Sequence, residues 1–301
     1  MTFPRGAVLA GVVVLWLGGI APAWGFAINE WRELEIQGAQ RVNGAPPVAS
    51  QPWTETVSGM DFVWIPGGCF NRGSAPDVTD RETDEGPIRQ ACVSHFWMGR
   101  TEVTQGQWRR VMRSNPSHHR KGDDYPVEGV AWDDIEGFQT RLARLYPQWA
   151  FEFRLPTEAE WEFACRDGGL GFRFAGGNDV GALGWHGENS DGYAHPVGSR
   201  RANSLGLSDL SGNVWEWVED VYRADGYATA PERDPRRQDP LGVFRVVRGG
   251  SYTSSSDRLR CANRGFAHYG EKRADLGFRL VLVPRAPQPP KPATELQDLP
   301  F

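Results

Sequence analysis

Apolar and polar residues alternate in four short segments of the chain, a pattern typical of strands with one buried face. These segments cover residues 60–66, 93–99, 243–248 and 277–283. An acidic stretch at residues 77–85 separates the first two, and we expect them to pair as neighbouring strands. Pro284 follows the last segment directly, so we expect the folded unit to end there.

Three other segments have apolar residues at helical spacing: 104–112, 132–146 and 157–166. Thr104 stands at the N-cap of the first, where its hydroxyl can accept from a free backbone N–H. Thr157 is followed three residues later by Glu160, which is the pattern of a capping box. The sequence therefore predicts three helices with local start signals.

Glu158, Glu160 and Glu162 also invite an interpretation as paired carboxylates for acid–base chemistry. Alternate residues on a helix point to different faces, so we expect the three not to converge. We predict a capping and surface role for them.

The composition favours one irregular domain without long helices. The chain has 13 Trp, 15 Phe and 7 Tyr beside 36 Gly and 22 Pro, which suits an aromatic core under many turns. Residues 168–212 are rich in Gly, Asn and Asp and have little periodicity. We predict a linker with a short helix at residues 26–57, a domain at residues 58–284 and a proline-rich tail at residues 285–301.

The N-terminus resembles a secretory signal. Arg5 precedes an apolar run at residues 7–20, and small residues at Ala23 and Gly25 suit cleavage. A membrane anchor is the alternative, but the run is shorter than the roughly 20 residues that span a bilayer. We predict a signal peptide at residues 1–25, export to the periplasm and no integral membrane segment after cleavage.

Charge and cysteine content restrict the possible partners and chemistry. The formal net charge is −5 and the two signs are interspersed, which argues against binding of nucleic acid. Export permits disulfides among the four cysteines, Cys69, Cys92, Cys165 and Cys261. Four cysteines allow three pairings, and the residues by themselves leave all three open.

Several motifs together resemble the formylglycine-generating enzyme, or sulfatase-modifying factor, family. They are Arg-Leu-Pro-Thr-Glu-Ala-Glu-Trp-Glu at 154–162, Gly-Asn-Val-Trp-Glu-Trp at 212–217, Arg-Gly-Gly-Ser-Tyr at 248–252, Cys-Ala-Asn-Arg at 261–264 and Leu-Gly-Phe-Arg at 276–279. The resemblance runs from about Met60 to Val283. It implies an irregular α+β fold with a C-type-lectin-like core and calcium held in loops. It also implies that Cys165 pairs with Cys261, which leaves Cys69 and Cys92 to bridge the first strand to the next.

The residues after the Gly-Gly-Ser-Tyr turn depart from the catalytic members of this family. Those members have two redox-active cysteines there that bind copper, whereas this chain has Ser254, Ser255 and Ser256 in a shorter segment. A hydroxyl is neither a soft ligand for Cu(I) nor readily oxidised. We therefore expect a protein that is not an enzyme. The serine segment either borders a cleft that still binds a peptide or small ligand, or is a surface loop of small residues.

The resemblance also implies sites for calcium. The family's ligands fall on Asp209, Gly212, Val214 and Glu216, which offer carboxylates and turn carbonyls. The alternative is that Asp209 and Glu216 cap local turns. Asp191 and the carbonyl of Tyr193 resemble half of a second calcium site, and an ordinary Asp-Gly turn explains that segment equally well.

Exported family members of two kinds suggest the function. One is a periplasmic regulator upstream of the threonine kinase that controls type VI secretion, which this chain resembles in length, export and motif loss. On that basis we expect a calcium-stabilised, non-catalytic scaffold whose partner is the sensor domain of a kinase or a lipoprotein. The acidic stretch 77–85 and residues 181–193 are the expected contact surfaces. The alternative is a periplasmic oxidative enzyme of siderophore maturation, as in formation of the pyoverdine chromophore.

Overall fold

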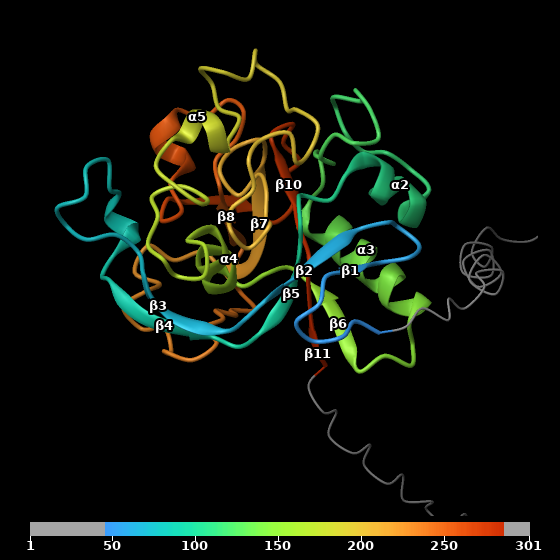
Figure 1. Cartoon of the computed structure of the whole chain (residues 1–301), viewed down its shortest axis with the longest axis horizontal. Helices are drawn as coiled ribbons and strands as arrows, with labels where there is room; N and C mark the ends of the chain where they lie inside the picture. Colours follow the sequence, from blue (N-terminus) through green and yellow to red (C-terminus); the bar gives the residue numbers. More distant parts are fainter. Residues whose placement is uncertain (1–45, 286–301) are drawn as a thin grey trace, which may run out of the picture. The chain divides into compact units, whose positions relative to one another are not determined.

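A five-stranded antiparallel sheet joins the beginning and the end of the described chain. The computed structural model describes residues 46–285, so the predicted signal peptide, most of the predicted linker and nearly all of the predicted tail lie outside it. The strand order is β1 (Trp53–Thr54), β2 (Asp61–Ile65), β5 (Phe96–Gly99), β11 (Val281–Pro284) and β6 (Phe151–Arg154). The last strand, β11, is thus held between β5 and β6 (Figure 1).

Strand β1 lies within the range that the sequence predicted to be a linker. Trp53 pairs with Phe62 of β2, and their ring centroids are 5.6 Å apart. Glu55 is completely buried and accepts a hydrogen bond from Tyr146. The linker prediction is therefore wrong for these residues, because a strand of two residues has no alternation to reveal it.

A second, four-stranded sheet has the order β10 (Leu276–Phe278), β7 (Trp215–Val221), β8 (Phe244–Arg248) and β9 (Arg264–His268). Strands β10 and β7 run parallel and the other pairs are antiparallel. Strands β3 (Gly68–Arg72) and β4 (Arg89–Val93) form a separate hairpin. Within this sheet β9 is an edge strand, and residues of β7, β8 and β9 line a cavity.

Three helices begin where the sequence predicted: α2 (Gln105–Met112), α3 (Trp132–Leu145) and α4 (Glu158–Cys165). The short α5 (Val180–Leu183) and the 3₁₀ turns η1 (Thr83–Glu85) and η2 (Ser256–Leu259) were not predicted. Thr104 and Thr157 are the N-caps of α2 and α4, and Glu160 completes the capping box of α4. Within residues 46–285, no helix has the length and apolar character needed to cross a membrane.

Two predicted strands are each divided between sheets. Residues 93–99 contain the last residue of β4 and all of β5, and residues 277–283 contain the end of β10 and most of β11. The second break falls at Arg279, whose buried guanidinium donates to the carbonyls of Gly99 and Ser208. Alternation along the chain marks extended backbone but does not reveal which sheet a residue joins.

The core is rich in aromatic side chains, as the composition predicted. Trp108 of α2 stacks on Phe138 of α3 with centroids 5.1 Å apart, and both rings meet Phe278 edge-on. These two helices lie beside each other in Figure 1. Helix α4 belongs to a second apolar cluster, in which Trp161 is completely buried. The helices thus cover the sheets with large rings rather than with long apolar faces.

Both disulfides of the chain are formed. Cys69 and Cys92 face each other across the β3–β4 hairpin, with Cα atoms 3.9 Å apart. Cys165 at the end of α4 is joined to Cys261, with Cα atoms 5.5 Å apart. All four cysteines are paired, and the pairings are those that the family resemblance implied.

Candidate functional site

A cavity of about 640 Å³ opens between the 3₁₀ turn η1 and the four-stranded sheet. We call it the cleft. Its aromatic lining comprises Trp215, Tyr222 and Phe266, and its charged lining comprises Arg81, Glu82, Asp84, Arg258, Arg264 and Arg273. The size is that of a site for a small molecule or for a few residues of a peptide.

The aromatic wall of the cleft extends onto the protein surface. Phe266 is 51% exposed, and its ring stacks on Tyr222 with centroids 4.4 Å apart. Phe244, which is also exposed, meets Phe266 edge-on at 5.6 Å. The hydroxyl of Tyr222 donates to Asp84 at 2.9 Å. Burial, together with this carboxylate, raises the pKa of Tyr222 to about 12, so it remains a hydrogen-bond donor.

The charges around the cleft are largely balanced by neighbours. Arg258 pairs with Glu82, Arg273 pairs with Asp275 at 2.8 Å, and Arg264 pairs with Glu158 at 2.7 Å. The Nε of Arg81 donates to a backbone carbonyl. A lining of rings and balanced charges favours a ligand of mixed polarity over a highly charged polymer.

Hydroxyl groups form a hydrogen-bonded cluster after the Gly-Gly turn. The Oγ of Ser251 lies 3.0 Å from Thr253 Oγ1 and 3.3 Å from Ser254 Oγ, and it donates to Asp275 at 3.0 Å. Ser256 begins η2. Within residues 46–285, no histidine is hydrogen-bonded to these hydroxyls, and the carboxylate that accepts from Ser251 and Thr253 is that of Asp275.

The four residues of the predicted first calcium site are all buried. Asp209 accepts a hydrogen bond from the backbone of Gly198 through Oδ2, and its buried Oδ1 has no partner among the described residues. Both oxygens of Glu216 already accept from Arg279, and Oε2 also accepts from Trp161. These residues meet the needs of calcium only in part. Asp209 has an oxygen without a hydrogen-bond donor among the described residues, whereas both oxygens of Glu216 already accept hydrogen bonds.

The loop between these residues is tightly fitted. Gly212 has a φ of +95°, and a Cβ there would lie 2.1 Å from the carbonyl oxygen of Trp185. The next residues lead Val214 into the core and Glu216 into β7. Within residues 46–285, there is no cluster of three or more His, Cys, Asp or Glu side chains arranged to hold a metal ion, so any ion here would need backbone carbonyls as ligands.

Glu102 is a third buried carboxylate here that the sequence reasoning missed. It is completely buried and accepts from Asn213 at 3.0 Å and from the backbone of Val214 at 3.2 Å. Burial, with the charges of Asp209 and Glu216, raises its pKa well above the ordinary value. Burial likewise raises the pKa of Asp209 to about 6. Glu102 lies more than a hundred residues before the loop, so no local pattern could have indicated it.

The residues of the predicted second calcium site lie on an exposed turn. Asp191 has a φ of +56° and is followed by Gly192 at +77°. The ring of Tyr193 is 47% exposed and lies under the Nζ of Lys121 at 3.2 Å. The local backbone is that of an Asp-Gly turn.

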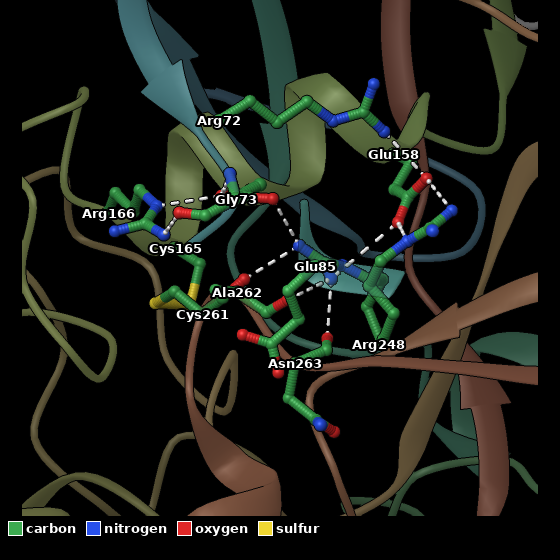
Figure 2. A network of polar contacts seen from close by, with 12 residues as sticks. Arg72, Gly73, Glu85, Glu158, Cys165, Arg166, Arg248, Cys261, Ala262 and Asn263 are labelled. Carbon is green, nitrogen blue, oxygen red and sulfur yellow. Dashed lines mark hydrogen bonds and ion pairs between the residues drawn. A yellow bond between two sulfur atoms is a disulfide. The ribbon is translucent and has the colours of Figure 1, made fainter. Parts of the chain in front are cut away.

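Helix α4 presents its glutamates to buried arginines, contrary to the surface role predicted for them. Glu158 pairs with Arg72 at 2.6 Å and with Arg264 at 2.7 Å. Glu162 pairs with Arg248 at 2.6 Å, and Figure 2 shows Arg248 among the carbonyls of the 261–263 segment. Glu158 and Glu162 are four residues apart and share a helix face, so the expectation that the glutamates do not converge is wrong for this pair.

The acidic stretch 77–85 is also less exposed than expected. Asp84 and Glu85 are buried, and Glu85 accepts from Arg260 through both oxygens at 2.7 and 2.8 Å. Its later part therefore anchors the wall of the cleft.

Comparisons with known proteins agree with this architecture. The chain matches the sulfatase-modifying factor enzyme 1-like domain over residues 48–283. It is 38% identical over 213 residues to a formylglycine-generating enzyme of Streptomyces coelicolor, covering 65% of this chain and 63% of that protein. It is 34% identical over 237 residues to the serine/threonine-protein kinase Pkn1 of Chlamydia trachomatis, covering 73% of this chain. The match spans 38% of the length of that kinase.

Two solved structures have a similar fold. Variable protein 1 of Treponema denticola gives a TM-score of 0.67 at 29% identity, covering 78% of this chain and 99% of that protein. PvdO from Pseudomonas aeruginosa gives a TM-score of 0.69 at 23% identity, covering 79% and 99%. The chain therefore belongs to the family of sulfatase-modifying factor enzyme 1-like domains and has the α+β, C-type-lectin-like fold of that family.

Proposed function

We propose that this protein is an exported, calcium-stabilised, non-catalytic member of its family that binds a segment of another periplasmic protein in the cleft. The observation that carries the proposal is an open cavity with aromatic and arginine walls. One of these arginines, Arg273, pairs with Asp275, which accepts from Ser251 in the turn that has hydroxyls in place of thiols. A cavity of this kind can bind without performing copper–thiolate oxidation.

The cysteine pairing supports a role without redox chemistry. The chain has four cysteines, and the two disulfides use all of them, so no thiolate is left for Cu(I). Disulfides also form preferentially in oxidising compartments, which supports export.

The lining of the cleft supports a polypeptide ligand. Exposed rings such as Phe266 and Phe244 supply contact area at low entropic loss, and the paired arginines offer hydrogen bonds without a large net charge. The contact surface that we propose is therefore the rim of the cleft. The acidic stretch 77–85 contributes through its side chains at that rim, such as Glu82.

The likeness to kinases supports a place in signalling. The matched portion is less than two fifths of each of three chlamydial serine/threonine-protein kinases, so in those proteins a domain of this type is part of a longer chain. By analogy, we propose that the partner is the periplasmic sensor domain of a threonine kinase, with the kinase that controls type VI secretion as the first candidate, or a lipoprotein.

A photo-crosslinking experiment tests the proposal. A benzophenone amino acid at Phe266 keeps an aromatic ring at the rim, and the same group at Leu170, which is 69% exposed, is the matched control. We expect a cross-linked periplasmic protein at position 266 and none at position 170. Phe266→Ala should then weaken binding of the purified partner at least tenfold.

The oxidative alternative makes a different prediction in the same material. An enzyme would consume dioxygen when it is given a thiol peptide or a siderophore precursor, and it would bind copper or iron in stoichiometric amount. Such turnover, or equal cross-linking at positions 266 and 170, would contradict the proposal.

A further inference from the structure

A second cavity, of about 190 Å³, lies under the segment that follows β7. We call it the Arg72 cavity. Its charged and aromatic lining includes Arg72, Glu158, Asp220, Tyr227, Arg237 and Arg264. Arg236 also lines the cavity and pairs with Glu219. Arg264 also lines the cleft, so its side chain is a wall common to both spaces.

The segment over this cavity is fixed by hydrogen bonds. The backbone N–H of Arg237 donates to Asp220 at 2.9 Å, and its carbonyl accepts from Val221 at 3.0 Å. The Nη2 of Arg237 donates to the carbonyl of Gly226 at 3.1 Å and to Thr229 Oγ1 at 2.7 Å. The cavity is therefore preformed in the folded protein.

Arg72 has unused donors at this cavity. The residue is 4% exposed, its Nη2 donates to Glu158 at 2.6 Å, and its guanidinium lies 3.9 Å above the ring of Tyr227. Among residues 46–285, its Nε has no hydrogen-bond partner, and Nη1 makes no hydrogen bond either. Figure 2 shows one of its nitrogens directed away from Glu158. Buried donors without partners are unfavourable, so such a group indicates a missing acceptor.

The charges of the lining favour an anionic acceptor. The carboxylate of Glu158 is already neutralised, because Arg264 donates to both of its oxygens and Arg72 to one. The guanidinium of Arg237 contacts a carbonyl and a hydroxyl but no carboxylate of the described chain. Asp220 uses its two oxygens to accept from the backbone of Glu158 and of Arg237. Arg72 and Arg237 thus retain donors for a ligand.

We propose that the Arg72 cavity binds a small oxyanion, a phosphate or a short carboxylate, between Arg72 and Arg237. Guanidinium groups recognise such anions through paired, charge-assisted hydrogen bonds. The volume admits a small ion and excludes a polypeptide. This anion site is distinct from the cleft, and the proposal does not depend on the function proposed for the cleft.

Isothermal titration calorimetry of the full-length protein with inorganic phosphate, and separately with succinate, tests the proposal at an ionic strength held constant with chloride. We expect saturable binding of one anion per chain, and the tighter of the two probes identifies the class. Arg72→Lys keeps a cation beside Glu158 but removes the planar guanidinium and its paired donors. It should therefore weaken binding of the anion at least tenfold.

Two matched variants locate the site. Arg144→Lys makes the same change on the exposed face of α3, and Arg273→Lys makes it in the cleft; both should bind as the wild type does. Circular dichroism and melting curves establish that Arg72→Lys is folded. Absence of saturable binding to the wild type, or loss in Arg273→Lys with retention in a folded Arg72→Lys, would overturn the proposal.

Discussion

Two buried clusters of charged side chains in the described part of the protein differ in their balance of positive and negative charge. Around α4, Arg72, Arg248 and Arg264 surround Glu158 and Glu162. Around the 209–216 loop, the carboxylates of Glu102, Asp209 and Glu216 have Arg279 as their nearby cation among the described residues. We call these the balanced cluster and the acidic cluster.

The pKa values of the carboxyl groups reflect this difference in charge balance. In the balanced cluster, burial alone would raise the pKa of Glu158, but the charges of Arg264, Arg72 and Arg248 hold it well below its usual range. In the acidic cluster, burial prevails and the pKa of Asp209 rises to about 6. The charges of the first cluster are neutralised by its own arginines, whereas the second keeps an excess of carboxylates that protonation would relieve.

The largest expected effect comes from breaking the balanced cluster. Arg248→Met leaves Glu162 and the carbonyls of Cys261 and Asn263 without their buried donor. We expect the free energy of unfolding to fall by about 3–5 kcal/mol, measured by urea denaturation. Arg258→Met removes an exposed pair with Glu82 and should cost less than about 1 kcal/mol. Equal losses in the two variants would contradict the comparison.

The next effect concerns calcium at the acidic cluster. At a free calcium concentration of 100 times the dissociation constant, chelation should lower the free energy of unfolding by about 3 kcal/mol. Denaturation curves with calcium and with chelator measure this directly. Asp220→Asn, which lies outside the cluster, should keep the same calcium dependence. If the denaturation curves of the wild type with calcium and with chelator coincide, calcium does not stabilise the protein and that part of the proposal is wrong.

Neutralising one carboxylate should have opposite effects in the two clusters. Asp209→Asn can keep the hydrogen bond from Gly198 while it removes a buried negative charge. Without calcium, its free energy of unfolding should therefore rise by about 1–2 kcal/mol. With calcium, it should be less stable than the wild type. Glu158→Gln should be destabilised in both conditions, because it leaves Arg72 and Arg264 unpaired. Destabilisation of Asp209→Asn without calcium would refute the idea of excess negative charge.

The smallest effect is a pH dependence from Asp220, which borders the balanced cluster. Burial, together with the charge of Glu158, raises its pKa from 3.8 to about 6. The folded state therefore binds this proton first as pH falls, and the resulting stabilisation is lost as pH rises through about 6. Glu102 also binds a proton as pH falls, so the contribution of Asp220 is measured in a background with Glu102→Gln and Asp209→Asn. There, lowering the pH from about 7.5 to about 5 should raise the free energy of unfolding by about 1 kcal/mol more with Asp220 than with Asp220→Asn.

The sequence predicted local elements well and their pairing less well. Helices α2, α3 and α4 and strand β2 were predicted close to their observed bounds, since periodicity and caps such as Thr104 and Thr157 act within a few residues. The divisions at residues 94–95 and 279–280 were missed, because neighbouring residues there enter different sheets.

The same limit applies to the candidate sites. The motifs identified the family and the loop with Asp209 and Glu216, and the serine segment was recognised as a place without thiols. Glu102 was missed, and the burial of Glu158 and Glu162 was predicted wrongly. Their partners lie far away in sequence, as Arg248 does from Glu162 and Glu102 from Asn213.

By itself, the sequence determined the helices α2, α3 and α4, the strand-forming segments, the family and the absence of cysteines from residues 253–260, because each depends on residue identity and short spacing. The tertiary structure decided which charges are buried, that one cluster is balanced and the other acidic, and that Arg72 faces a cavity. These properties depend on long-range contacts, since the pKa of a carboxylate is set by the groups that folding brings to it.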